Sequence, residues 1–230
     1  MRIPNISEGL LALRLLGPRL FVRKLARLLY SKTRFLVFVK DLDQESPVSG
    51  NKVMLSPGSS EDVAKFFHLM LKESRESRYE LLERKRFYEK GFRSCYIGRM
   101  IDSTEVCCIF WLVTNRDIER AGSENYYPTL REDDIFMENT YMLEKFRGRG
   151  IMDDVARQIE GIIRQMGFKR WIRFPQESNL PSVRMCLKSG HLLSQRFLLC
   201  RFLFQTRKKN IEHFDPPIPY YLHPKTEKPG

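Results

Sequence analysis

The chain has no apolar run that approaches the roughly 20 residues needed by a helix that crosses a lipid bilayer. It also lacks a secretory signal, because Arg14, Arg19, Arg23 and Lys24 interrupt what should be an apolar stretch. Its five cysteines are an odd number without metal-ligand spacing, so we expect reduced thiols and no metal site. These absences predict a cytoplasmic protein.

Zinc fingers, RNP-type aromatic motifs and basic zippers are missing as well, so the net charge of +12 alone does not predict a nucleic-acid partner. Much of the charge lies in residues 1–40, which hold nine Lys or Arg and one acid, Glu8. Within them, residues 9–30 are typical of a basic amphipathic segment. Such a segment binds an anionic membrane surface or packs on the protein's own core, and both interpretations stay open here.

Hydrophobic content of 42% in 230 residues allows one well-buried α/β core. Runs of β-branched and aromatic residues predict strands at 34–40, 94–101, 105–113, 135–143, 169–174 and, as two short strands, within 192–204. Apolar residues at helical spacing predict helices at about 59–74, 75–90, 151–166 and 182–189. We expect a loop at 41–58, an irregular stretch at 114–134, and an extended or disordered Pro-rich tail from 207.

A glycine-rich stretch, Lys145-Phe146-Arg147-Gly148-Arg149-Gly150-Ile151, lies between a predicted strand and a predicted helix. Two glycines one residue apart let the backbone curl and direct several N–H groups at one point. The helix beginning near Ile151 adds its own unpaired N–H groups, which favour an anion. The stretch predicts a pyrophosphate cradle, although a simple strand-to-helix turn is the alternative for the heptad taken alone.

Two motifs together resemble those of the GNAT superfamily of N-acetyltransferases. Lys145, Gly148 and Gly150 match the [QR]-x-x-G-x-G/A signature, and the segment from Asn179 to His191 resembles the second motif, with Gly-His in place of Gly-Phe. The resemblance spans roughly residues 34–204. Residues 86–112 also resemble the middle region of bacterial GNAT proteins associated with surface-polysaccharide synthesis.

The resemblance implies an α/β fold with a mixed, largely antiparallel sheet that is splayed between the strands at 135–143 and 169–174 and flanked by helices. Acetyl-CoA or another acyl-CoA would lie in the splay, without a metal. The implied cofactor-binding residues are Tyr141, Met142, Leu143, Arg147, Gly148, Arg149, Gly150, Ile151 and Asn179. The implied reaction is direct attack of an amine on the thioester.

Amine attack needs a base that deprotonates the ammonium and an acid that protonates the departing thiolate. Glu138, on the motif strand, is the candidate base, with a solvated or salt-bridged carboxylate as the alternative. Family members often carry Tyr at the position of Cys186. Cys186 is therefore the candidate acid, and a small buried core residue is the alternative.

The sequence thus predicts three parts: a basic segment at 1–33, an acyltransferase domain at 34–206 and a tail at 207–230. The predicted function is acyl-CoA-dependent N-acylation of a small amine, such as an amino sugar or amino acid derivative, near the inner membrane surface. Two alternatives stay open. The acyl donor could be acyl carrier protein, which is acidic and suits a basic chain, or the fold could serve as an inactive binding or regulatory module.

Overall fold

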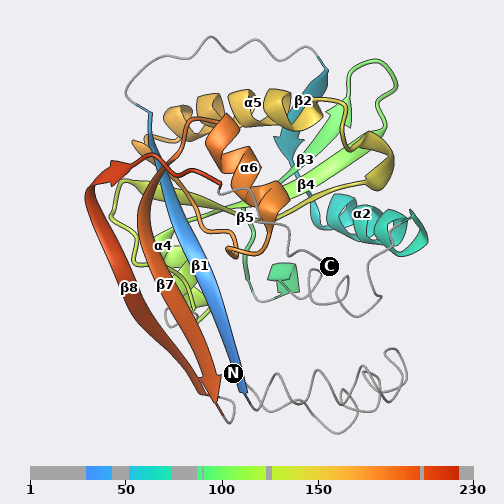
Figure 1. Cartoon of the computed structure of the whole chain (residues 1–230). Helices are drawn as coiled ribbons and strands as arrows, with labels where there is room; N and C mark the ends of the chain where they lie inside the picture. Colours follow the sequence, from blue (N-terminus) through green and yellow to red (C-terminus); the bar gives the residue numbers. More distant parts are fainter. Residues whose placement is uncertain are drawn as a thin grey trace, which may run out of the picture.

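The computed structural model describes residues 30–42, 52–73, 87–89, 91–122, 126–202 and 205–222. Within these residues eight strands form one sheet in the order β2-β3-β4-β5-β6-β1-β7-β8 (Figure 1). The strands are β1 (Tyr30–Asp41), β2 (Val53–Pro57), β3 (Cys95–Met100), β4 (Val106–Val113), β5 (Asp134–Met142), β6 (Arg170–Arg173), β7 (Leu192–Phe202) and β8 (Gln205–Ile218).

Neighbouring strands pair antiparallel throughout this sheet except for β5 and β6, which are parallel. The prediction of a mixed, largely antiparallel α/β sheet is therefore confirmed. The helices are α2 (Ser60–Glu73), α4 (Asn115–Arg120), α5 (Ile151–Gln165), α6 (Leu180–Lys188) and the short 3-10 helix η1 (Glu144–Phe146). Figure 1 shows α5 and α6 crossing one side of the sheet, with α4 behind it. None of the helices in the described ranges has the length and apolar character of a membrane span.

Strand β1 supplies residues to two apolar cores, because successive side chains of a strand point to opposite faces. Phe35, Val37 and Val39 enter the larger core, together with apolar residues of β3, β4, β5, α2 and α5. Leu36 and Phe38 enter a smaller core under α6. The N-terminal strand thus lies deep in the domain and joins β6 to β7.

Helix α5 begins and ends where its sequence predicts. Ile151, Val155, Ile159 and Ile163 recur at four-residue spacing and are all buried. Gly167 follows the helix with φ of 84°, and its N–H donates to the Arg164 carbonyl at 2.9 Å, which closes the last turn. The helix at the predicted cradle is therefore firmly seated on the sheet.

Strand β2 lies inside residues 41–58, which we expected to be a loop. Its position depends on α5: the buried Asp154 carboxylate accepts from the backbone N–H groups of Lys52 and Val53 at 3.0 and 3.1 Å. The Gln158 side chain adds a bond from its Nε2 to the Val53 carbonyl at 2.6 Å. Contacts about 100 residues apart along the chain therefore hold a strand that is too short to show clear periodicity.

Three further regions differ from the expectation. The irregular stretch at 114–134 contains α4, which Thr114 and Asp117 cap reciprocally. Residues 192–204 include one long strand, β7, rather than two short ones. From residue 207 we expected an extended or disordered Pro-rich tail. Residues 205–218 are extended, but they form strand β8, which pairs with β7. Within the predicted helix at 75–90, only residues 87–89 belong to the described part of the chain. The basic segment before Tyr30 lies outside the described residues.

Candidate functional site

The sheet opens between β5 and β6. Their parallel ladder joins Asp134–Phe136 to Arg170–Ile172, while β5 continues to Met142. The second half of β5 therefore extends past the end of this ladder and does not pair with β6 there. A parallel pair that separates in this way leaves backbone edges facing a gap, which is the geometry expected of an extended ligand that pairs with a strand.

A β-bulge lies in the separating half of β5. Ile109 pairs with Tyr141 but Trp111 pairs with Glu138, so two steps along β4 match three steps along β5. Asn139 lies in this bulge with a left-handed φ of 50°, which Asn tolerates better than most residues. Bulges bend the strand and change the direction of its side chains. The bulge therefore redirects β5 at the point where it leaves β6.

The predicted cradle follows β5 after one 3-10 turn. Gly148 and Gly150 have φ of 76° and 70°, so both adopt the left-handed conformation that glycine enters without steric penalty. Gly150 is the N-cap of α5 and carries no side-chain cap, and the first N–H groups of a helix have no partner within the helix. Residues 148–150 are exposed and Ile151 is buried, so the turn presents the backbone of residues 148–150 and the positive end of the α5 dipole at one point.

The basic side chains around the cradle have separate roles. Lys145, predicted at the Q/R position, pairs with Glu105 instead of pointing into the cradle. Arg147 donates from Nε to the Met142 carbonyl at 3.0 Å, and its guanidinium lies 5.1 Å from the centroid of the Tyr141 ring. The backbone N–H of Arg147 already donates to the Glu144 carbonyl at 3.1 Å. Arg147 thus braces the turn, which leaves the backbone of residues 148–151 as the candidate site for an anion.

Lys52 lies beside the predicted cradle, a position that sequence reasoning did not indicate. Its Nζ lies 3.3 Å from the Arg149 carbonyl oxygen and 3.7 Å from the place that a Cβ on Gly150 would occupy. The Asp154 bonds to the backbone of Lys52 and Val53 fix the start of this side chain. Nothing local in the sequence signals the contact, because Lys52 precedes the cradle by about 100 residues.

Of the predicted residues on β5, Met142 is the one whose backbone faces the gap. Met142 lies opposite Cys108 and Tyr141 opposite Ile109 in the ladder with β4, and the Leu143 N–H donates to the Cys107 carbonyl at 3.0 Å, so Leu143 directs its backbone groups toward β4. Backbone groups of successive strand residues alternate between the two edges. Met142 therefore directs its backbone groups away from β4, where its carbonyl accepts the bond from Arg147.

Glu138, the predicted base, lies on β5 immediately before the bulge and is half-buried. Its charge acts on Tyr127, a residue that is only 5% exposed. Burial raises the pKa of the Tyr127 hydroxyl, and the negative charge of Glu138 raises it further. Tyr127 thus stays a neutral phenol beside the carboxylate at all physiological pH values.

Asn179 and Cys186 lie at the start of α6 and on its buried face. The Asn179 Oδ1 accepts from the Ser182 N–H at 3.3 Å, so this exposed side chain is the N-cap of α6. Cys186 is fully buried in the smaller core with Leu36 and Phe38, and burial raises the pKa of its thiol. The environment of Cys186 is that of a packed apolar residue, which is the alternative that the sequence left open.

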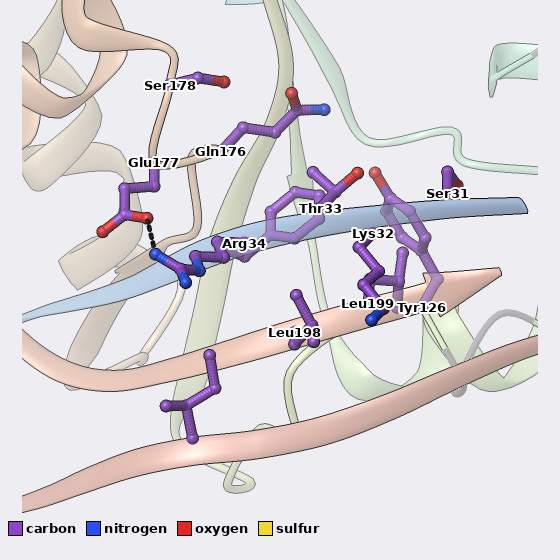
Figure 2. Close-up of a pocket in the computed structure, with 12 residues that line it drawn as sticks. Ser31, Lys32, Thr33, Arg34, Tyr126, Gln176, Glu177, Ser178, Leu198 and Leu199 are labelled. Atoms are coloured by element: carbon purple, nitrogen blue, oxygen red, sulfur yellow. Dashed lines mark ion pairs between the residues drawn. The ribbon is translucent and has the colours of Figure 1, made fainter. Parts of the chain in front are cut away.

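A groove of about 890 Å³ lies beside the first half of β1 (Figure 2). Its walls come from β1, the segment after β6, β7, β8 and the loop before β5. The residues that line it are Ser31, Lys32, Thr33, Arg34, Phe35, Tyr126, Gln176, Glu177, Ser178, Leu198, Leu199 and Ile211. The volume falls in the range of small-molecule sites.

Several solved structures share this fold. The glucosamine N-acetyltransferase region of a fungal multi-domain GH3 β-N-acetylglucosaminidase superposes with a TM-score of 0.56 at 13% identity, covering 79% of this chain and 22% of that one. An acetyltransferase of the GNAT family from Colwellia psychrerythraea gives 0.52 at 9% identity, covering 80% and 62%. A GCN5-related N-acetyltransferase from Sphaerobacter thermophilus gives 0.50 at 13% identity, covering 84% and 57%. The chain thus spans less than two thirds of the length of each.

A comparison with curated proteins found no significant match. The sequence model described as the acetyltransferase (GNAT) family matches residues 67–191, which is more than half of the chain. The matched range contains β3, β4, β5, the cradle, α5, β6 and α6, and so it includes both sides of the gap. By its sequence and by its fold, the chain belongs to the GNAT acetyltransferase family.

Proposed function

We propose that this chain is an acyl-CoA-dependent N-acyltransferase, most simply an N-acetyltransferase, that acylates the amine of a small molecule. One observation carries the proposal. The ladder between β5 and β6 ends at Phe136 and Ile172, and β5 then leads through a bulge directly to the left-handed glycines at the start of α5. An edge that can pair with pantetheine amides and a cradle for a pyrophosphate thus follow each other along one strand.

The donor site fits acyl-CoA in its chemistry. The backbone N–H groups of residues 148–151 would hold the pyrophosphate, and Lys52 and Arg149 would supply positive charge beside it. Met142 would pair with the pantetheine arm, Tyr141 and Leu143 would hold β5 in place, and Asn179 would contact the arm from the start of α6. When bound, acyl-CoA supplies a thioester whose acyl carbon is open to attack by an amine.

The acceptor chemistry requires the chain to remove a proton from an ammonium. Glu138 suits this role, because it lies at the bulge where β5 leaves β6 and remains partly exposed. The phenol of Tyr127 lies near it and is held neutral by burial. Cys186 is enclosed by the smaller core and serves packing in this proposal. The thiolate that leaves would then take its proton from water or from the attacking nitrogen, which must lose a proton as the amide forms.

Two other proposals concern the donor and the surroundings of the enzyme. The net charge of +12 would also favour acyl carrier protein, an acidic partner, as the acyl donor. The basic residues within 9–30 would favour an anionic membrane surface. An inactive binding module is the third alternative, and the core position of Cys186 is its main support.

Native mass spectrometry of the full-length protein tests these proposals together. We expect a one-to-one complex with acetyl-CoA and, after an amine is added, release of free coenzyme A. A complex with acyl carrier protein alone would favour the carrier-dependent alternative. Acetyl-CoA binding without transfer to any amine would favour the binding module. A protein that binds none of these donors contradicts the proposed function.

A further inference from the structure

Arg173 is a buried cation at the point where the sheet opens. The ladder between β5 and β6 ends with Phe136 opposite Ile172, so Arg173 is the first residue of β6 that β5 no longer joins. On its other side Arg173 still pairs with Phe38 of β1. Its side chain is only 5% exposed, and its Nη1 atom has no hydrogen-bond partner among the described residues. A buried cation with an unpartnered donor is costly, so it calls for a functional explanation.

Other polar atoms without partners gather beside Arg173. Its guanidinium lies 5.6 Å from the centroid of the Trp171 ring, and this ring makes edge-to-face contact with His191, with centroids 4.7 Å apart. Both ring nitrogens of His191 and the Nε1 of Trp171 are buried without a hydrogen-bond partner in the described part of the chain. Phe38, the strand partner of Arg173, packs in the smaller core with Cys186. The two positions that depart from the family motif, Cys186 and His191, therefore border one buried polar site.

Arg173 and Glu138 flank the start of the gap from opposite faces of the sheet. Arg173 shares the face of its partner Phe38, which is the face that α6 covers (Figure 1). Ile172 precedes Arg173 and so points to the other face, together with its ladder partner Phe136. Glu138 follows Phe136 by two residues and lies on that second face as well. The candidate base thus borders the start of the gap on one face, and the buried cation borders it on the other.

The start of the gap is also where the thioester would lie. The predicted cradle is at the C-terminal end of β5, and the ladder with β6 ends near the N-terminal end of the same strand. Acyl-CoA that rests its pyrophosphate on residues 148–151 and pairs with Met142 therefore extends back along β5 toward Glu138. An amine deprotonated by Glu138 would approach from one face, and the sulfur would be left facing Arg173 on the other.

We propose that Arg173 is a catalytic residue that holds the negative charge of the coenzyme A sulfur as the thiolate departs. The inference rests on the proposed function and deepens it, because it assigns a residue to the half of the reaction that Cys186 does not serve from the core. The N–C bond forms, the C–S bond breaks, and the electron pair of the C–S bond passes to the sulfur. Arg173 stabilises this charge until the sulfur takes the proton that the attacking nitrogen loses. A guanidinium suits the role, since it stays charged and donates several hydrogen bonds from a fixed plane.

Coenzyme A binding tests the inference without knowledge of the acceptor. Free coenzyme A carries a thiol, whereas acetyl-CoA carries no titrating sulfur, and the two molecules share all their other titrating groups. A cation beside the sulfur favours the thiolate and so lowers the pKa of the bound thiol, which makes coenzyme A bind more tightly as pH rises. We expect calorimetry to show that affinity for coenzyme A, relative to acetyl-CoA, rises by at least about tenfold from pH 6 to pH 8.5.

The protein's own titrating groups beside Arg173 do not imitate this effect. Burial raises the pKa of the Cys186 thiol and lowers the pKa of His191 well below its usual value, so both stay neutral over this range. Lys40 and Glu160 form an ion pair with each other between β1 and α5. Their charges act alike on coenzyme A and on acetyl-CoA, so the comparison of the two ligands cancels them.

Arg173→Met should abolish the rise in coenzyme A affinity with pH and leave acetyl-CoA affinity nearly unchanged. Its Tm should not fall, because the change removes a buried cation and keeps an apolar side chain. Arg196→Met is the matched control. The Arg196 guanidinium likewise lies 5.6 Å from a ring centroid, that of Tyr220, but on β7, which is two strands away from β6. This variant should keep the rise in full.

The outcomes separate the two levels of the account. A wild-type protein that binds neither acetyl-CoA nor coenzyme A refutes the proposed function and the inference with it. If acetyl-CoA binds but both ligands show the same pH dependence, the proposed function stands and the role of Arg173 is overturned. That role is also overturned if folded Arg173→Met keeps the rise, or if Arg196→Met loses it to the same extent.

Discussion

Replacing Gly150 by alanine tests whether the cradle depends on backbone conformation. Gly150 has φ of 70°, and a Cβ in this left-handed region costs about 1–2 kcal/mol. The added Cβ would meet only the Lys52 Nζ, at an ordinary contact distance of 3.7 Å, so the penalty is conformational rather than a clash. For a chain of this size we expect a loss of about 2–6 °C in Tm.

The same change should also weaken acetyl-CoA binding. A backbone that relaxes from the left-handed region turns the N–H groups of the α5 start away from their common point. We expect calorimetry to show at least a roughly tenfold rise in Kd, or about 1.4 kcal/mol. Gly150→Val should abolish binding, because a β-branched residue is still less tolerant of this conformation.

Gly167→Ala provides the matched control at the other end of the same helix. Gly167 has φ of 84°, and a Cβ there would meet no atom within 4 Å. We expect a similar fall in Tm with unchanged affinity for acetyl-CoA, because only the conformational penalty is shared. If the Gly150 and Gly167 variants bind acetyl-CoA equally well, the cradle assignment is wrong.

Four further changes probe the rest of the account. Glu138→Gln should lower kcat by more than about a hundredfold, leave KM for acetyl-CoA nearly unchanged and remove the acidic limb of the pH–rate profile; an unchanged limb would assign the base elsewhere. Lys52→Ala should raise Kd for acetyl-CoA about three- to fivefold, whereas Lys145→Ala, whose cation is engaged by Glu105, should leave it unchanged. Cys186→Ala should destabilise the fold by about 1–2 kcal/mol and change kcat by less than about tenfold; a larger loss in a folded variant would make Cys186 the acid. Liposomes with about one third anionic lipid should co-sediment the full-length protein at low salt, and deletion of residues 1–29 should abolish this, because each Lys or Arg near the surface adds about 1 kcal/mol.

The parts of the fold that could be predicted from the sequence are those that short stretches determine. Helix α5 has its apolar spacing, its left-handed start at Gly150 and its end at Gly167 within a single stretch. The tight glycine turn at Gly148 and Gly150 was predictable for the same reason. The family motifs then fixed the gap between β5 and β6, which no local pattern in the two strands reveals.

The parts that could not be predicted depend on contacts between distant residues. Strand β2 has five residues and is held by Asp154 and Gln158 of α5. Strand β8 contains prolines that normally indicate a loop, yet it pairs with β7 at the edge of the sheet. The groove and the position of Lys52 likewise arise when segments that are far apart in sequence meet, so no spacing rule could have indicated them.

A crystal structure of the full-length protein with acetyl-CoA tests the central claim most directly. The account predicts that the pyrophosphate lies on the N–H groups of residues 148–151 beside Lys52, and that the pantetheine arm lies between β5 and β6 with Met142 as a backbone partner. It also predicts that the acetyl group lies near Glu138. Acetyl-CoA bound at another surface, or a gap in the sheet that stays empty at saturating acetyl-CoA, would contradict it.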